Sequence, residues 1–184
     1  MIPYEKENEG FKYLLTCIDV FSKYSWGIPI KNKKAEDVIE GFNIIFKQRI
    51  PNKLQTDLGK EFYNSKFAKL MKENNINHFS TNSPLKASVV ERFNRTLKEK
   101  MWKVFSQNNN HEWISIIDDL IYNYNNSFHR SIKMTPIEAS IGKNEEKVRF
   151  SLYSNVSKMK VAKFNIGDKD MNKITRQKYL KFVK

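Results

Sequence analysis

The chain has 184 residues, of which 40% are hydrophobic and 13% aromatic, with only six glycines and five prolines. This length allows one domain with a buried core plus a fragment of a second, and the composition excludes disordered, collagen-like and low-complexity proteins. The 33 basic and 20 acidic residues give a net charge of +13, which favours a nucleic acid as partner over an anionic membrane surface or simple solubility.

The first predicted elements are two strands between Phe11 and Ile30, joined by a hairpin turn at Phe21–Tyr24. The first strand is a near-continuous apolar run, and the second alternates apolar with small or polar residues. From Ala35 to Gln48 apolar residues recur at helical spacing, and Pro51 closes the segment. This pattern predicts a helix that covers a sheet.

A short strand, a helix and another short strand follow. The strand Lys53–Thr56 ends at the sequence Asp57-Leu58-Gly59, and Asn64–Asn74 carries apolar residues on one face of a helix. The next strand is Asn77–Thr81, and the segment Asn82–Ser88 is expected to be a mobile loop.

The remaining part of the domain is helical. Val89–Phe105 has the strongest helical periodicity in the chain, and Trp113–Phe128 marks another helix. Thr135-Pro136-Ile137-Glu138 is a helix start with a capping threonine, a proline at the first position and an acid at the third. Strands and helices in this order predict an α/β layer fold over residues 1–145.

Residues 146–184 form a basic C-terminal extension. This segment holds 11 basic and 3 acidic residues, so it carries more than half of the net positive charge of the chain. A solvated basic tail and a nucleic-acid contact are both compatible with this charge.

The sequence has no membrane or secretion signal that we recognise, and few metal-binding residues. No apolar run approaches the roughly 18 residues that a spanning helix needs, and the first residues lack the order of a signal peptide. We therefore expect a soluble, intracellular protein with no membrane partner. The one cysteine, Cys17, is expected to be a buried structural thiol, and His78, His111 and His129 are too scattered to indicate a metal site.

Two carboxylates occupy positions suited to a metal site. Asp57 follows a strand, where open α/β sheets place their sites, and Glu91 opens a helix after a loop. Two such acids brought together repel each other unless a cation lies between them, and oxygen ligands suit Mg²⁺ or Mn²⁺. The alternatives are a turn that Asp57 forms with Gly59, and a helix-terminal Glu91 that pairs with Arg95.

Basic residues share the outward face of the Glu91 helix. Arg95 and Lys98 lie four and seven positions after Glu91, opposite the apolar stripe of that helix. This places an acid next to cations on a surface turned to solvent.

The amino-acid sequences of four segments resemble those of one protein family. Thr16–Tyr24, Thr56–Phe62 and Ser88–Lys98 strongly resemble the retroviral-type integrase catalytic core, most closely that of Maverick/Polinton elements and virophages. Asn126–Pro136 resembles the segment that follows the catalytic helix in this family. The resemblance covers roughly residues 10–140.

This resemblance implies a ribonuclease H-like fold, a mixed sheet flanked by helices. It also implies a D,D-E triad that holds two Mg²⁺ or Mn²⁺ ions, with Asp57 as second and Glu91 as third carboxylate. Arg95 and Lys98 match helix positions that face DNA in such integrases, and Asn94 lies beside them.

The first acid of the triad departs from the family pattern. The family places it on a strand before the Gly10–Tyr13 turn, yet no Asp precedes Asp19 in this chain. We expect that strand to lie upstream of Met1 or to be lost. Asp19 matches an Asp that is not a metal ligand in this family; its use as a substitute, or that of Glu5 or Glu7, is the alternative.

Beyond the core, Val161–Lys169 resembles the strand that opens an SH3-like or chromodomain-like barrel in these integrases. The roughly 20 residues after it are too few to close a barrel, so a disordered basic tail is the alternative.

The implied function is DNA integration: metal-dependent 3′-end processing and strand transfer of element DNA into target DNA by a homo-oligomer. The location would be the nucleus or a viral replication site. One alternative is an inactive or domesticated core that binds DNA or oligomerises, and a weaker one is a ribonuclease H-type nuclease.

Overall fold

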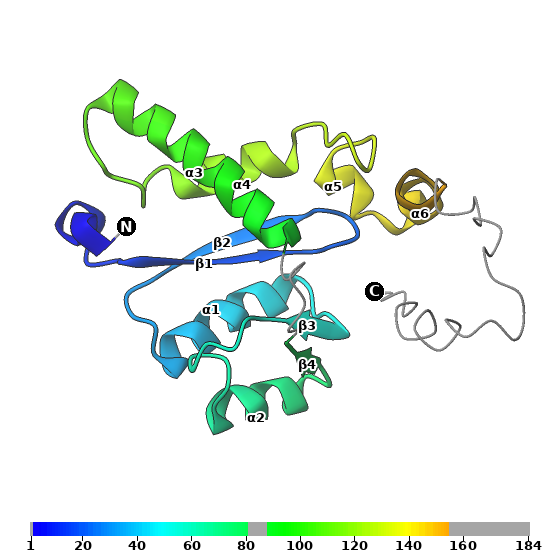
Figure 1. Ribbon diagram of the computed structural model, residues 1–184, viewed down its shortest axis with the longest axis horizontal. Helices are drawn as coiled ribbons and strands as arrows, with labels where there is room; N and C mark the ends of the chain where they lie inside the picture. Colours follow the sequence, from blue (N-terminus) through cyan, green and yellow to red (C-terminus); the bar gives the residue numbers. More distant parts are fainter. Residues whose placement is uncertain (1, 81–87, 155–184) are drawn as a thin grey trace, which may run out of the picture.

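The computed structural model describes residues 2–80 and 88–154. It has three layers (Figure 1): α3 (Ser88–Asn108) and α4 (Ile117–Asn125) lie on one side of a β-hairpin, and α1 (Ala35–Gln48) lies on the other. The predicted loop at 82–88 falls almost wholly outside the described residues, and the predicted strand at 161–169 falls entirely outside them. No helix among the described residues is long and apolar enough to cross a membrane.

The hairpin joins β1 (Tyr13–Ile18) to β2 (Ser25–Ile30) in antiparallel register, with Tyr13 opposite Ile30 and Ile18 opposite Ser25. The turn between them is organised by Asp19, whose Oδ1 accepts the amide of Phe21 at 3.0 Å. Its Oδ2 accepts the hydroxyl of Ser22 at 2.6 Å. The predicted pair of strands and the turn are therefore confirmed.

Both faces of β1 are covered, which explains its near-continuous apolar sequence. Leu15 and Cys17 pack into the core beneath α1, whereas Leu14 and Ile18 pack into the core beneath α3 and α4. Helix α1 approaches closely at Gly41, where an added Cβ would lie 2.7 Å from Cδ2 of Leu15.

Helix α1 joins the hairpin to a second, smaller α/β unit. In it β3 (Lys53–Gln55) and β4 (Asn77–Phe79) pair in parallel, and α2 (Ser65–Glu73) connects them. Asn64 caps α2 by accepting the amide of Phe67 through Oδ1 at 2.9 Å. One core contains residues of the hairpin, α1, β3 and α2: Leu15, Trp26, Val38, Phe42, Ile45, Leu54, Phe67, Leu70 and Met71.

The strands form two separate two-stranded sheets within residues 2–80 and 88–154. The expected mixed α/β class is confirmed, since one pair is antiparallel and the other parallel. In Figure 1, β1 lies on the side of the hairpin nearer the β3–β4 pair, but no hydrogen-bonded ladder joins β1 to β3 there.

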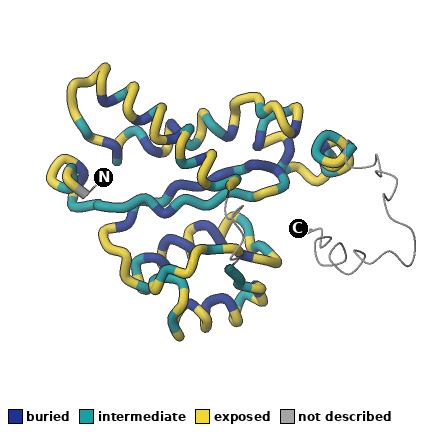
Figure 2. Tube along the Cα trace, viewed as in Figure 1, coloured by how far each residue is buried: buried dark blue, intermediate teal, exposed yellow. Residues whose placement is uncertain are grey.

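Helix α3 packs on the opposite face of the hairpin with a second core: Phe93, Leu97, Met101, Phe105, Trp113, Ile117 and Leu120. Figure 2 shows buried positions on the inner side of α3 and exposed positions along its outer side. The predicted helix at 113–128 is shorter than expected, because residues 114–116 form a turn before α4 begins.

The N-terminal 3-10 helix η1 (Ile2–Asn8) is tied to the α3–α4 connection by Asn8. The buried Asn8 side chain accepts the amide of Trp113 at 2.6 Å and donates to the carbonyl of His111 at 3.0 Å. Both ends of its amide are thus satisfied, as a buried polar group requires.

Short helices complete the described chain: α5 (Pro136–Ala139), η2 (Gly142–Asn144) and α6 (Glu145–Tyr153). The predicted capping box of Thr135 and Glu138 is present. Helix α6 crosses the predicted boundary between residues 145 and 146, and its fully buried Val148 packs with Ile132. The division into a core and a basic extension stays a prediction, and a test of the extension has to leave α6 intact.

Candidate functional site

Helix α3 presents a polar stripe on the side opposite its buried residues. The apolar positions of α3, such as Phe93 and Leu97, are almost fully buried and determine how the helix is rotated about its axis. Glu91, Arg95 and Lys98 are exposed as a result, and Asn94 is half-buried. The predicted outward face is therefore present as a rigid surface.

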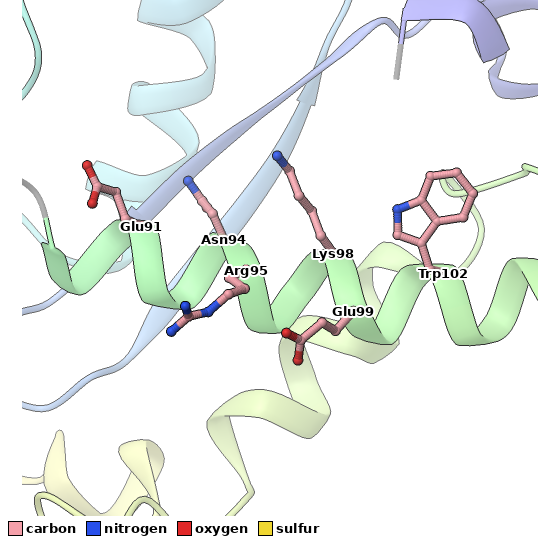
Figure 3. A pocket seen from close by; sticks show the side chains of 6 residues that line it. All are labelled: Glu91, Asn94, Arg95, Lys98, Glu99 and Trp102. Carbon is pink, nitrogen blue, oxygen red and sulfur yellow. The ribbon is translucent and has the colours of Figure 1, made fainter.

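The polar residues of this stripe line a shallow hollow of about 440 Å³. Its lining residues are Glu91, Asn94, Arg95, Lys98, Glu99 and Trp102. Figure 3 shows two rows within it: Glu91, Asn94, Lys98 and Trp102 project in one direction, and Arg95 and Glu99 in the other. The structure thus brings the three predicted DNA-contacting residues together with Glu91.

Asn94 has an orientation that suits binding. Its Oδ1 is buried and has no hydrogen-bond partner within the described part of the chain. Its amide nitrogen points outward in the same direction as Lys98 (Figure 3). Asn94 therefore presents a neutral donor next to a cation, a pair that suits phosphate oxygens.

Asp57 lies in an exposed turn two residues after β3. Its Oδ1 accepts the amide of Gly59 at 3.2 Å, so the turn that the sequence suggested does form. An added Cβ at Gly59 would lie 2.5 Å from Oε2 of Glu61 and 3.1 Å from Oδ1 of Asp57. The carboxylates of Asp57 and Glu61 therefore approach the same glycine, and a side chain there would displace the end of Glu61.

The arrangement of Asp57 and Glu91 is compatible with a shared metal site but incomplete. The N-terminal end of α3, which carries Glu91, is the end of that helix nearer the β3–β4 pair in Figure 1. Their exposed carboxylates are hard oxygen donors of the kind that Mg²⁺ or Mn²⁺ prefers. Among the residues that the structure describes, no group of three or more His, Cys, Asp or Glu could hold a metal ion.

The other acids considered from the sequence have structural partners. Oδ2 of Asp19 contacts Nη1 of Arg49 at 3.0 Å in addition to its bonds in the hairpin turn. Glu5 pairs with Lys12 at 2.8 Å, and Glu7 accepts the amide of His111 at 2.9 Å. These contacts favour structural roles for Asp19, Glu5 and Glu7.

Cys17, His78 and His129 are not among the residues that line the hollow. Burial raises the pKa of the Cys17 thiol to about 12, in keeping with a structural role. Nε2 of His78 forms a hydrogen bond with Oγ1 of Thr56 at 2.8 Å, and burial lowers the pKa of His78. Burial also lowers the pKa of His129, with a further contribution from the nearby positive charges of Lys23 and Arg92.

Trp102 and Glu99 also line the hollow, but they were not predicted as site residues from the sequence. Trp102 lies 11 positions after Glu91, about three helical turns, and so falls on the same stripe. That spacing is a signal that could have identified it, but apolar neighbours such as Met101 and Phe105 suggest a buried position.

The family model described as "Integrase core domain" matches residues 1–84. A transposon-derived protein of Caenorhabditis elegans is 35% identical over 170 residues, which is 91% of this chain and 57% of that protein. The Pro-Pol polyprotein of feline foamy virus is 29% identical over 137 residues, or 73% of this chain and 12% of the polyprotein. The chain thus spans little more than half of one relative and a small part of the other.

Solved structures resemble the chain in fold. The HTLV-2 integrase catalytic core domain, in complex with magnesium in a trimeric form, has a TM-score of 0.62 at 19% identity and covers 70% of this chain and 84% of that one. The catalytic core domain of BIV integrase has a TM-score of 0.61 at 18% identity, and the match covers 73% of this chain and 88% of that one. A chain of the simian T-cell lymphotropic virus intasome has a TM-score of 0.63 at 22% identity, and the match covers 68% of this chain and 47% of that one.

Proposed function

Because the chain has the ribonuclease H-like fold of retroviral-type integrase catalytic cores and matches the integrase core domain over residues 1–84, we propose that it acts in DNA integration. In this proposal it binds DNA along α3 and belongs to a metal-dependent polynucleotidyl transferase. Its substrates would be the ends of an element and a target DNA, and it would work as a homo-oligomer.

The hollow on α3 carries this proposal. Glu91 there lies beside Asn94, Arg95 and Lys98 on one rigid helix. A carboxylate next to cations suits a site that holds a metal ion and a phosphate backbone at the same time. The fixed rotation of the helix allows these groups to be positioned before DNA arrives.

Each residue has a distinct role in the proposed reaction. Asp57 and Glu91 would hold Mg²⁺ or Mn²⁺, which supplies charge for activating the attacking oxygen and stabilising the leaving oxygen. Lys98 and Asn94 would orient the scissile strand through its phosphates, and Arg95 would neutralise charge on the other row of the hollow. Water would be the nucleophile in 3′-end processing, and the freed 3′-hydroxyl the nucleophile in strand transfer.

We infer that a third carboxylate of this site lies on a further strand. The edge of β1 that does not pair with β2 faces the β3–β4 side of the hairpin in Figure 1, and Leu15 of β1 shares a core with Leu54 of β3. A strand pairing along that edge would lie between the two sheets and next to the end of β3. We propose that an acid on such a strand completes the site.

The second candidate function is a core that binds DNA or oligomerises without catalysis. One observation favours it: Asp19, the first Asp in this chain, is already engaged by Ser22 and Arg49. The DNA-binding surface on α3 would be the same in both cases.

DNA binding tests the proposal common to both candidates. We expect Lys98→Ala to weaken binding of labelled duplex DNA severalfold. It should also reduce the slope of log affinity against log salt concentration by about one, as the loss of one phosphate contact predicts. Lys72→Ala is the matched control, since Lys72 is an exposed lysine of α2, on the other side of the hairpin. Equal losses for the two variants, measured by fluorescence anisotropy, would show that α3 is not the DNA-binding surface.

A further inference from the structure

Trp102 is a large aromatic side chain exposed at the end of the polar stripe. It is 51% exposed, whereas the other two tryptophans, Trp26 and Trp113, are 7% and 0% exposed. Exposed tryptophan on a charged surface is a common feature of binding sites. No part of the proposed phosphate binding requires a ring at this position.

The ring of Trp102 is held by other aromatic side chains. It meets Phe105 edge to face at 5.5 Å between ring centroids and His111 at 6.0 Å. His111 in turn stacks on Tyr4 at 4.1 Å, and its amide donates to Glu7. The indole is therefore supported from η1 and from the α3–α4 connection while about half of it remains accessible.

Trp102 and Lys98 lie one helical turn apart in the same row of the hollow (Figure 3). Trp102 lies four positions after Lys98, which is about 6 Å along α3 at 1.5 Å per residue. A DNA strand with a phosphate at Lys98 would therefore bring a base of an adjacent nucleotide within reach of the Trp102 ring.

We propose that Trp102 is a stacking platform for an unpaired DNA base, with Lys98 binding the neighbouring phosphate. This inference rests on the proposed binding of DNA along α3. A base inside a duplex has both faces covered by its neighbours, so a ring on a helix surface stacks only on a base that is unpaired. The stripe would therefore hold a frayed or single-stranded DNA end in preference to an intact duplex.

The order of the residues along the row favours DNA over an apolar peptide as the occupant. The row begins with Glu91, continues with the outward amide of Asn94 and then Lys98, and ends at Trp102, so the cation and not the acid is next to the ring; Arg95 and Glu99 project to the other side (Figure 3). A polyanion with flat bases matches a cation followed by an aromatic ring, as in other single-strand binding surfaces.

Tryptophan fluorescence of the full chain tests this proposal, because Trp102 is the accessible fluorophore and Trp26 and Trp113 are buried. The probes are a short oligothymidylate and its duplex with the complementary oligodeoxyadenylate. We expect the single strand to quench the emission strongly and the duplex to quench it weakly. Trp102→Ala should remove the quenching and lower the single-strand affinity about tenfold, with less than about a twofold loss for the duplex.

Two further variants separate this inference from the proposed function. Trp102→Phe keeps an aromatic ring and should recover most of the single-strand affinity, and Lys98→Ala should weaken binding of both probes. Either of two results would overturn the stacking role alone. One is binding that depends on Lys98 but is lost equally for both probes in Trp102→Ala. The other is single-strand binding without quenching. A chain that binds neither probe would overturn the proposed function together with it.

Discussion

Nη1 of Arg49 lies 3.0 Å from Oδ2 of Asp19 and so joins the end of α1 to the turn of the β1–β2 hairpin. The guanidinium also lies over the rings of Tyr24 and Trp26, at 5.4 and 5.6 Å from their centroids. The pair is partly buried, with side-chain exposures of 35% for Arg49 and 24% for Asp19. Asp19 is therefore a structural residue that connects two layers of the fold.

We expect Asp19→Asn to lower the free energy of unfolding by about 1–2 kcal/mol, because it weakens charge-assisted hydrogen bonds to Ser22 and Arg49. Urea denaturation measures this loss, and Arg49→Ala combined with Asp19→Asn should cost less than the sum of the single variants. DNA binding should be retained. A loss of metal-dependent activity without any loss of stability would instead assign Asp19 to the metal site.

The chain as it stands should be nearly inactive in cleavage and strand transfer with Mg²⁺ or Mn²⁺. Two carboxylates can hold one ion, but clamping both the attacking and the leaving oxygen requires a further bridging acid. Adding an upstream strand that carries an Asp should restore activity, and Asp57→Asn or Glu91→Gln should then abolish it while DNA binding persists.

The matched control for these carboxylate variants is Glu73→Gln, since Glu73 is an exposed acid of α2 that pairs with Lys69. It should leave strand transfer unchanged. A crystal structure of the extended protein with Mn²⁺ should place Asp57 and Glu91 on the same ion. Robust strand transfer by the unextended chain, lost in Asp19→Asn, would contradict this assignment of the acids.

DNA affinity should fall steeply with salt because phosphate contacts dominate binding. Residues 155–184 contain nine basic and two acidic residues, so removing them should reduce the salt slope more than Arg95→Ala does. The cut follows Ser154 because α6 contributes the buried Val148 to the core. Equal slopes for the intact and shortened chains would indicate a segment that serves solubility alone.

The thiol of Cys17 should react slowly with alkylating reagents in the native protein, because its pKa is raised from 9.0 to about 12 by burial. The folded state then favours the protonated thiol. The contribution of the protonated Cys17 thiol to the free energy of unfolding is fully present below pH 9 and decreases as the pH rises from 9 towards 12. Alkylation followed by mass spectrometry should show rapid reaction only after unfolding; fast native reaction at pH 8 would contradict the raised pKa of this partly buried thiol.

Much of the local structure was predictable from the sequence. The bounds of α1 (Ala35–Gln48) coincide with the predicted segment, and the capping box at Thr135 is present. Apolar periodicity and capping residues determine such elements because their signals lie within a few turns of chain. The outward position of Arg95 and Lys98 follows from the same periodicity.

The tertiary structure decided what these local patterns leave open. Asp19 became a structural link because Arg49, 30 positions later, packs beside it. Trp102 is exposed although its neighbours Met101 and Phe105 are buried, and Asn8 is buried because the α3–α4 connection supplies its partners. Burial and long-range hydrogen bonds depend on how separate elements pack against each other, and spacing within a single element does not contain that information.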